Sequence, residues 1–169
     1  MKKFAVLVVL AALLAPVAVA EETPQAPRLG MVERALSWIG VRYRFGGQDE
    51  KKGFDCAGLV KRVFSTVAVD LPRTAAAQFR QGCIVKRDEL QPGDLVFFEN
   101  TYKRGISHVG IYIGNGEFVH AASSRRSVTV DRLDSPYFDK RFAGGRRVVT
   151  AAVVPPLPMP DPPAEMGMP

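Results

Sequence analysis

The spacing of apolar residues changes about halfway along the chain, and this change limits the possible folds more than any other feature. Before residue 91, apolar side chains recur at helical spacing, as in the stretch from Leu29 to Ile39. After it, short apolar or alternating runs lie between turns that contain glycine or proline, which is typical of strands. We expect strands at Leu95–Phe98, His108–Ile113, Glu117–Ala122, Ser127–Leu133 and Arg146–Val154. Helices followed by hairpin strands predict an α+β domain with an antiparallel sheet.

The segment Gly53-Phe54-Asp55-Cys56 precedes a second stretch with helical spacing, which runs to about residue 68. Its apolar side chains are Leu59, Val60, Val63, Phe64 and Val67. Asp55 is a favoured N-cap residue, and Gly53 permits a sharp turn into the helix. Unpaired N–H groups and the positive end of the helix dipole favour a thiolate at Cys56. Cys56 is therefore a candidate nucleophile, and the alternative interpretation is a small buried apolar residue.

Both histidines of the chain lie in the hairpin expected around Gly114-Asn115-Gly116. If the loop has three residues with Gly116 left-handed, residues whose numbers sum to 230 pair across the strands. His108 and His120 then share one face of the hairpin as diagonal neighbours. A two-residue Asn-Gly turn would place them on opposite faces. On the shared face, His108 can accept a proton from Cys56 or form an ion pair with it, and His120 can orient the ring of His108.

The two faces of this hairpin have different expected neighbours. Gly110 and Ala122 are small residues on the histidine face, and we expect them to leave room for the helix that carries Cys56. Val109 and Ile111 point to the other face and are expected to pack a core.

Cys56 and Cys83 are the two cysteines of the chain. They can form a disulfide in an oxidising compartment, although the bridge would consume the candidate nucleophile, so an unpaired and buried Cys83 is favoured. A zinc site from these cysteines with His108 and His120 is disfavoured, because the gaps between them are long and irregular. We expect no metal and no cofactor.

The first twenty residues have the pattern of a cleaved secretory signal. Lys2 and Lys3 precede an apolar run from Phe4 to Leu14, and Ala18-Val19-Ala20 fits a cleavage site. The run is too short to span a bilayer comfortably. Because no cysteine lies near the cleavage site, we do not expect a lipid anchor. Residues 21–28 are expected to form a flexible leader, 29–154 one catalytic domain, and 155–169 a disordered tail rich in proline and methionine. The sequence predicts a periplasmic or secreted protein.

The formal net charge is +6, which falls to about +4 without Lys2 and Lys3. An exported protein rarely meets nucleic acid, so the basic residues favour peripheral contact with an anionic envelope polymer or a solvated surface without a partner. We expect no nucleic-acid partner, no transmembrane segment and a monomer.

The order of the motifs resembles the NlpC/P60 family of bacterial cell-wall cysteine peptidases. The resemblance covers about residues 31–149 without large insertions, in segments Tyr43–Gly47, Phe54–Val60, Leu71–Thr74, Pro92–Phe98, His108–Gly114 and Phe118–Ala121. It implies a papain-like arrangement, in which N-terminal helices, including the nucleophile helix, pack on a five- to six-stranded antiparallel sheet.

The resemblance also implies roles for individual residues. The implied nucleophile, base and orienting residue are Cys56, His108 and His120. Tyr43 matches a family tyrosine beside the nucleophile, which with the Cys56 backbone N–H can stabilise the oxyanion. Asp55 matches a residue that reads substrate amines in some members, although capping the helix already accounts for it. Ala57 departs from the usual serine, which affects the substrate contacts that can be transferred from relatives.

The implied activity is hydrolysis of amide bonds in peptidoglycan stem peptides or their cross-links. The closing segment Tyr137–Arg147 resembles that of single-domain cross-link endopeptidases, which favours cleavage of cross-links over cleavage between D-Glu and the diamino acid. Two alternatives remain. One is an amidase or acyltransferase of the same fold that acts on another envelope substrate. The other is a non-catalytic wall-binding protein that uses its basic patch and proline-rich tail.

Overall fold

The computed structural model describes residues 26–148 of the 169-residue chain. The expected signal sequence, most of the leader, the proline-rich tail and the last residues of the strand expected up to Val154 lie outside this range. Among residues 26–148, no helix combines the length and the apolar character that crossing a membrane requires.

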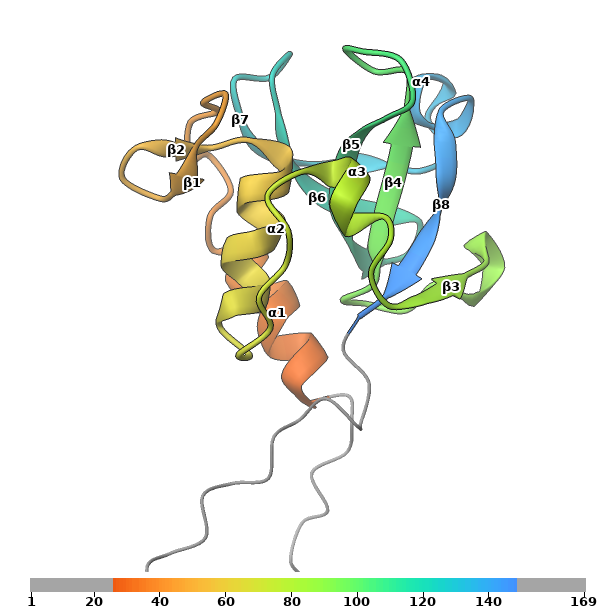
Figure 1. Cartoon of the computed structure of the whole chain (residues 1–169), viewed down its shortest axis with the longest axis horizontal. Helices are drawn as coiled ribbons and strands as arrows, with labels where there is room; N and C mark the ends of the chain where they lie inside the picture. Colours follow the sequence, from red (N-terminus) through yellow and green to blue (C-terminus); the bar gives the residue numbers. More distant parts are fainter. Residues whose placement is uncertain (1–25, 149–169) are drawn as a thin grey trace, which may run out of the picture.

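The centre of the molecule is a six-stranded antiparallel sheet with the strand order β3-β8-β4-β5-β6-β7 (Figure 1). The strands are β3 (Cys83–Val85), β4 (Leu95–Glu99), β5 (Ile106–Gly114), β6 (Glu117–Ala122), β7 (Ser127–Arg132) and β8 (Phe142–Arg147). With the helices described next, this sheet confirms the predicted α+β class.

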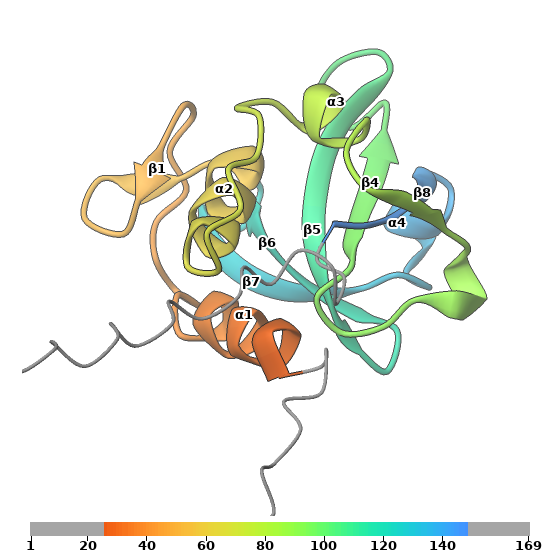
Figure 2. The same cartoon turned by 60° about the horizontal axis from the view of Figure 1, so that its bottom comes forward.

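The helices are α1 (Ala26–Leu36), α2 (Cys56–Ser65), α3 (Ala75–Gln78) and α4 (Pro136–Asp139), with a 3-10 turn η1 (Arg87–Glu89). Two short strands, β1 (Gln48–Asp49) and β2 (Gly53–Phe54), form a separate hairpin ahead of α2. Helices α1 and α2 contact each other and β5, and they lie on the same side of the sheet (Figures 1 and 2). Helix α1 begins at Ala26, three residues before Leu29, where the apolar spacing predicts its start.

Helix α3 matches a short helix that the sequence predicts from its cap Thr74 through Gln81, whereas five elements have no predicted counterpart: β1, β2, β3, η1 and α4. Each is four residues long or shorter, so hydrophobic periodicity cannot reveal it. Strand β8 begins at Phe142 instead of Arg146. Its sequence, Phe-Ala-Gly-Gly-Arg-Arg, is poor in strand-forming residues, which explains why its first half was not recognised.

The sheet separates two hydrophobic cores of different character. The helix-side core includes Leu59, Val60 and Val63 of α2 with Val109 and Ile111 of β5. The opposite face carries a smaller, largely aromatic cluster, here called the aromatic core, made of Val96, Phe98, Phe118, Leu133 and Phe138. Helix α2 thus packs on the Val109 face.

The expected room for α2 on the histidine face is therefore wrong. The space beside Gly110 is filled from its own sheet, since a side chain there would place its Cβ 2.5 Å from Cδ2 of Phe118. Gly110 is required by the close approach of β6, and it leaves no opening for the helix.

The β5–β6 hairpin has the predicted register through a different loop. Ile111 pairs with Val119, and Tyr112 pairs with Phe118, so the paired numbers sum to 230 as predicted. The turn itself is the two-residue Asn115-Gly116 type, with φ values of 54° and 76°. A β-bulge between Tyr112 and Gly114 absorbs the extra residue. The bulge restores the register that places both histidines on one face.

The start of α1 and the end of β8 are joined through one carboxylate. Asp94, just ahead of β4, is fully buried. It accepts hydrogen bonds from Arg28 of α1 at 2.8 Å and from Arg147 of β8 at 2.7 and 2.9 Å. This ion-pair cluster connects the two ends of the described chain.

Candidate active site

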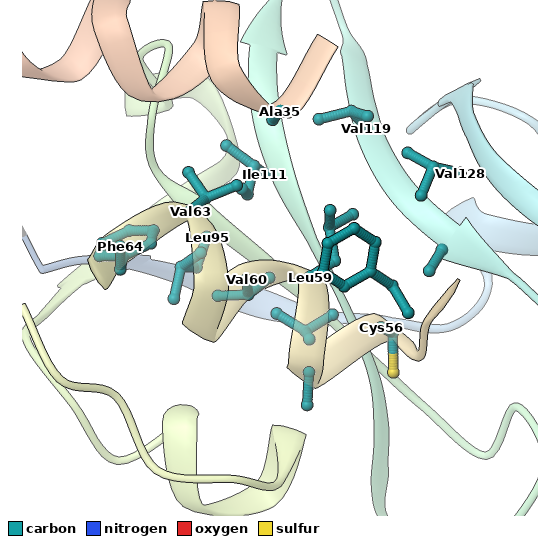
Figure 3. Close-up of a cluster of buried hydrophobic side chains, with 14 of the residues drawn as sticks. Ala35, Cys56, Leu59, Val60, Val63, Phe64, Leu95, Ile111, Val119 and Val128 are labelled. Atoms are coloured by element: carbon teal, nitrogen blue, oxygen red, sulfur yellow. The ribbon is translucent and has the colours of Figure 1, made fainter. Parts of the chain in front are cut away.

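Cys56 is the first residue of α2, and its backbone is held by two local features. Asp55 caps the helix as predicted, because its Oδ1 accepts the N–H of Gly58 at 2.7 Å. Gly58 lets the 43–47 loop approach the helix, since a Cβ there would lie 2.0 Å from the carbonyl oxygen of Gly47. Cys56 is 7% exposed, and its sulfur lies at the edge of the helix-side core (Figure 3).

The thiol of Cys56 is protonated in the resting protein. Burial, followed by the negative charge of Asp55, raises its pKa to about 11. Backbone N–H groups of Val109, Ala57 and Cys56 itself act in the opposite direction but do not prevail. The thiolate predicted from the helix N-terminus is therefore wrong for the resting site, because desolvation outweighs the dipole. Helix α2, which carries Cys56 at its first turn, packs against β5, the strand that carries His108.

The two histidines form a direct pair. Nε2 of His108 and Nδ1 of His120 are 2.7 Å apart, and His120 is 2% exposed. Their rings lie against the aromatic core, with Phe138 at 6.3 Å from His108 and 5.4 Å from His120 between ring centroids. Burial, followed by the charge of His120, lowers the pKa of His108 well below its ordinary value. His108 is therefore a neutral imidazole, able to accept a proton.

Cys56 lies between two cavities that together form a cleft. The histidine-side cavity, of about 460 Å³, is lined by Cys56, His108 and His120, with Arg125 and Tyr137 at its far side. The arginine-side cavity, of about 300 Å³, is lined by Cys56 together with Tyr43, Asp55, Ala57, Arg73, Tyr102 and Lys103. All five residues that the sequence selected for the site thus border this cleft.

Two tyrosines border the cleft together with the thiol. Tyr43 and Tyr102 line both cavities, as Cys56 does. Burial, followed by the charge that Cys56 would carry, raises the pKa of each hydroxyl. Both hydroxyls therefore stay protonated and can donate hydrogen bonds. Sequence reasoning missed Tyr102, which lies 61% exposed in the loop between β4 and β5, outside any motif.

Asp55 has its oxygens occupied by the protein itself. Arg73 donates to both carboxylate oxygens, at 2.9 and 2.6 Å, and Gly46 donates its N–H to Oδ2 at 2.9 Å. Arg73 precedes Thr74, which caps α3. The role of Asp55 toward substrate amines stays a prediction. Arg73 belongs to a motif that the sequence comparison used, yet no role was inferred for it, because its partner lies 18 residues away.

His120 has a second polar partner that the sequence did not suggest. Its Nε2 lies 3.0 Å from Oδ2 of Asp131 on β7. Strand β7 alternates Val128 and Val130 toward the helix-side core with Thr129 and Asp131 on the other face. The sequence signal that could have revealed Asp131 is its place in an alternating strand, on the face opposite to Val128 and Val130 and next to the strand that carries His120.

The cysteines show no sign of pairing in the structure. Both are free, with Cys83 exposed on the edge strand β3 and Cys56 buried. The expectation of a buried Cys83 is therefore wrong, because a three-residue edge strand covers it on one side only. Within residues 26–148 no cluster of three His, Cys, Asp or Glu side chains could hold a metal ion.

The arrangement suits nucleophilic attack on a carbonyl carbon. A neutral thiol lies beside a neutral imidazole that can remove its proton as the sulfur attacks. Protonated tyrosines and the N–H groups at the start of α2 can donate to the oxygen that becomes negative.

Comparison with known proteins identifies the family of the chain. The model of the NlpC/P60 family matches residues 40–147. Gamma-DL-glutamyl hydrolase of Bacillus subtilis is 43% identical over 125 residues, which cover 73% of this chain and 30% of that protein. Murein DD-endopeptidase MepS/Murein LD-carboxypeptidase of Escherichia coli is 42% identical over 123 residues, covering 71% and 62%.

The backbone comparison gives the same result. The crystal structure of an NlpC/P60 family protein from Bacillus cereus superposes with a TM-score of 0.68 at 31% identity, covering 72% of this chain and 40% of that one. The matched region spans 30% to 62% of the length of the two curated relatives named above. The family match contains the whole cleft, from Tyr43 to Phe138, and extends over more than half of the sequence. The chain belongs to the NlpC/P60 family.

Proposed function

We propose that this protein is an exported cysteine peptidase that hydrolyses amide bonds in peptidoglycan stem peptides or their cross-links. One observation carries the proposal: Cys56, at the first turn of α2, lines one cavity together with both histidines, which form a direct pair. The names of the relatives support a peptide of the cell wall as substrate. The signal-like residues 1–20 support export to the compartment where that substrate lies.

The proposed reaction starts from the neutral pair. The sulfur of Cys56 attacks the amide carbonyl carbon while its proton passes to His108. The tetrahedral intermediate collapses, the carbon–nitrogen bond breaks, and His108 returns the proton to the leaving amine. Water then attacks the thioester with His108 as base, which releases the acid and restores the thiol. His120 holds the ring of His108 through the 2.7 Å contact between their nitrogens.

The oxyanion is proposed to form between the helix and the loops. The backbone N–H of Cys56 and the hydroxyl of Tyr43 are its donors, and Tyr102 lies in the same lining. Since the pKa of Tyr43 is raised, its hydroxyl remains a donor at alkaline pH.

The charges of the cleft fit a substrate that carries carboxylates. Lys103 lines the arginine-side cavity, where the charge of Arg73 is balanced by Asp55, and Arg125 lines the histidine-side cavity. The acidic side chains in these linings are bonded to the protein, Asp55 to Arg73 and Asp131 to His120. A peptide with carboxylates on both sides of the scissile bond would therefore meet cations on both sides of Cys56.

Cleavage of a cross-link is the first candidate, and a γ-glutamyl bond is the second. The MepS relative is named for DD-endopeptidase activity. The relative at 43% identity is named for gamma-DL-glutamyl hydrolysis, which favours keeping the second candidate. The two reactions differ in products, because the first converts cross-linked dimers to monomers and the second leaves stems that end in D-Glu.

The test is digestion of purified peptidoglycan by residues 21–169, with the fragments identified by mass spectrometry. Cys56→Ala removes the proposed nucleophile, and Cys83→Ala is the matched control, since Cys83 is exposed on an edge strand outside the cleft. We expect monomers from the wild type and from Cys83→Ala, and none from Cys56→Ala.

The other outcomes select the alternatives. Stems ending in D-Glu would show that the γ-glutamyl bond is cleaved and not the cross-link. A Cys56-dependent product from a different envelope amide or ester would indicate the amidase or acyltransferase. Intact peptidoglycan with retained binding to the sacculus would overturn the peptidase in favour of a wall-binding protein.

A further inference from the structure

Asp131 extends the histidine pair into a line of three polar groups. Nε2 of His108 lies 2.7 Å from Nδ1 of His120, and Nε2 of His120 lies 3.0 Å from Oδ2 of Asp131. Both nitrogens of His120 therefore have a polar partner, Nδ1 toward His108 and Nε2 toward Asp131. The line runs from Asp131 on β7 through His120 on β6 to His108 on β5, which lines the histidine-side cavity together with Cys56.

The register of three neighbouring strands produces this line. His120 pairs with Thr129, and Asp131 stands two residues further along the same face of β7. A diagonal neighbour at this separation is within reach of a long side chain. The aromatic core lies under the pair, with Phe118 at 4.8 Å and Phe138 at 5.4 Å from the His120 ring centroid. These rings exclude competing polar partners from that side.

The protons along the line follow from the chemistry of its members. An ionised carboxylate can only accept, so Nε2 of His120 carries the proton toward Asp131. A neutral His120 then has a lone pair on Nδ1, which accepts the Nε2 proton of His108. A neutral His108 with its proton on Nε2 has its lone pair on Nδ1. That nitrogen is the one left to take the proton of Cys56.

The opposite set of tautomers would block the reaction. If His120 carried its proton on Nδ1, it would donate to Nε2 of His108, and His108 would carry its own proton on Nδ1. Its lone pair would then face His120 instead of the thiol. The structure assigns to Asp131 the role of a positioning residue that selects the productive tautomers of both histidines and acts on the reaction through His120.

The charges around the line agree with an ionised Asp131. The bond to His120 is the first cause that lowers the pKa of Asp131, and Arg125 of the β6–β7 turn lies 3.7 Å from its Oδ1. The other titratable groups that border the histidine-side cavity are Cys56 of α2, Tyr43 and Tyr102 of the loops, and Tyr137 of α4. The pKa values of Cys56, Tyr43 and Tyr102 are raised, so these three groups carry no charge at pH 7. Asp131 is thus the anion available to the histidine pair.

The kinetic part of the test rests on the proposed peptidase function. Asp131→Asn keeps the shape but lets the side chain either donate or accept, so both sets of tautomers form. We expect kcat on a purified cross-linked muropeptide to fall about tenfold or more, with KM within about twofold. Loss of the anion lowers the pKa of the histidine pair, so the acid limb of the pH profile moves to lower pH. A structural role alone would leave that limb in place.

Two further variants keep the test sharp. Asp134→Asn is the matched control, because Asp134 is an exposed carboxylate of the next turn bonded to Arg132. It should leave kcat and the pH profile unchanged. Asp131→Glu keeps a carboxylate and should recover at least part of the lost kcat. Equal kcat values for wild type and Asp131→Asn would overturn the assignment.

A second readout does not depend on the substrate. Nitrogen-15 NMR of Cys56→Ala protein reports which nitrogen of each histidine carries its proton. We expect the proton on Nε2 of His120 and of His108, and a mixture of tautomers once Asp131→Asn is added. A proton on Nδ1 of His120, or tautomers that do not respond to Asp131→Asn, would overturn the inference. If the wild type cleaves no muropeptide, the proposed function fails, and this readout still decides the role of Asp131.

Discussion

Asp94 and Asp55 each form ion pairs with arginine, but the two carboxylates lie in different parts of the molecule. Asp94 lies fully buried between Arg28 and Arg147 and joins α1, β4 and β8. Asp55 lies beside the thiol and accepts both arms of Arg73. The chemistry of the two pairs is the same, a carboxylate with a guanidinium fork.

The pairs differ in what surrounds the arginine. Arg28 is 8% exposed at its side chain, whereas Arg73 is 33% exposed and lines the arginine-side cavity. The first pair is closed by protein on all sides and can only hold the fold together. The second is partly open to the cleft, and both of its residues line the arginine-side cavity. Burial, and not the type of bond, therefore separates a structural ion pair from a functional one.

The largest effect on stability is expected at Asp94. Asp94→Ala leaves the buried charge of Arg28 without its partner, and the free energy of unfolding should fall by about 3–5 kcal/mol. Asp55→Ala loses a helix cap and a partly exposed pair, so about 1–2 kcal/mol is expected. Urea unfolding measures both. The folded fraction of Asp94→Ala should keep its activity, and a smaller loss of stability at Asp94 than at Asp55 would break the comparison.

Activity should show the reverse order at Arg73. Arg73→Met removes the two bonds that orient Asp55 and a cation of the cleft, so kcat/KM should fall about tenfold or more. The free energy of unfolding should change by less than about 1 kcal/mol, because a third of the side chain is exposed. Arg80→Met is the matched control, since Arg80 is exposed and lies outside both cavities. Equal kcat/KM for the two variants would contradict a functional role for the Arg73 pair.

The pH dependence of Cys56 gives a finer comparison of the two carboxylates. Alkylation by iodoacetamide requires the thiolate, so in a Cys83→Ala background its rate should rise through a pKa of about 11. The charge of Asp55 contributes to this raised pKa. Asp55→Asn removes the charge and keeps a favoured cap, so the profile should move to lower pH. Asp94→Asn should leave it in place, and a shift with Asp94→Asn would show that Asp55 has no special influence.

Local features were predictable from the sequence, and contacts between distant segments were not. The helix after Cys56 and its Asp55 cap follow from residues within one or two turns of each other. The shared face of the two histidines was predicted only for a three-residue loop, and the structure reaches the same register with a two-residue turn and a bulge. The bulge that sets this register was not foreseen, since two loop types were compatible with Gly114-Asn115-Gly116 and only tertiary packing selects between combinations of turn and bulge.

The two arginine clusters illustrate the limit. No role was predicted for Asp94, because its partners Arg28 and Arg147 are 66 and 53 residues away. The raised pKa of Cys56 was missed for a related reason. The helix dipole can be inferred from sequence, but burial depends on how β5 and the 43–47 loop close over the thiol. Asp131 was missed because its meaning depends on the register of β6 with β7.

The smallest effect is expected within the Asp94 cluster itself. A lysine supplies one ammonium where arginine supplies a planar fork, so the cost of an Arg→Lys exchange depends on how many bonds the fork makes in a buried place. Arg28 also donates to the carbonyl oxygens of Gln91 and Pro92, and Arg28→Lys should cost about 1–2 kcal/mol. Arg147 is 26% exposed, so water can replace lost bonds, and Arg147→Lys should cost less than about 1 kcal/mol. Urea unfolding of the two variants side by side measures the difference. A larger loss of unfolding free energy for Arg147→Lys would show that the exposure of the arginine does not determine how much each ion pair stabilises the protein. The difference between the Asp94 and Asp55 clusters would then need another cause.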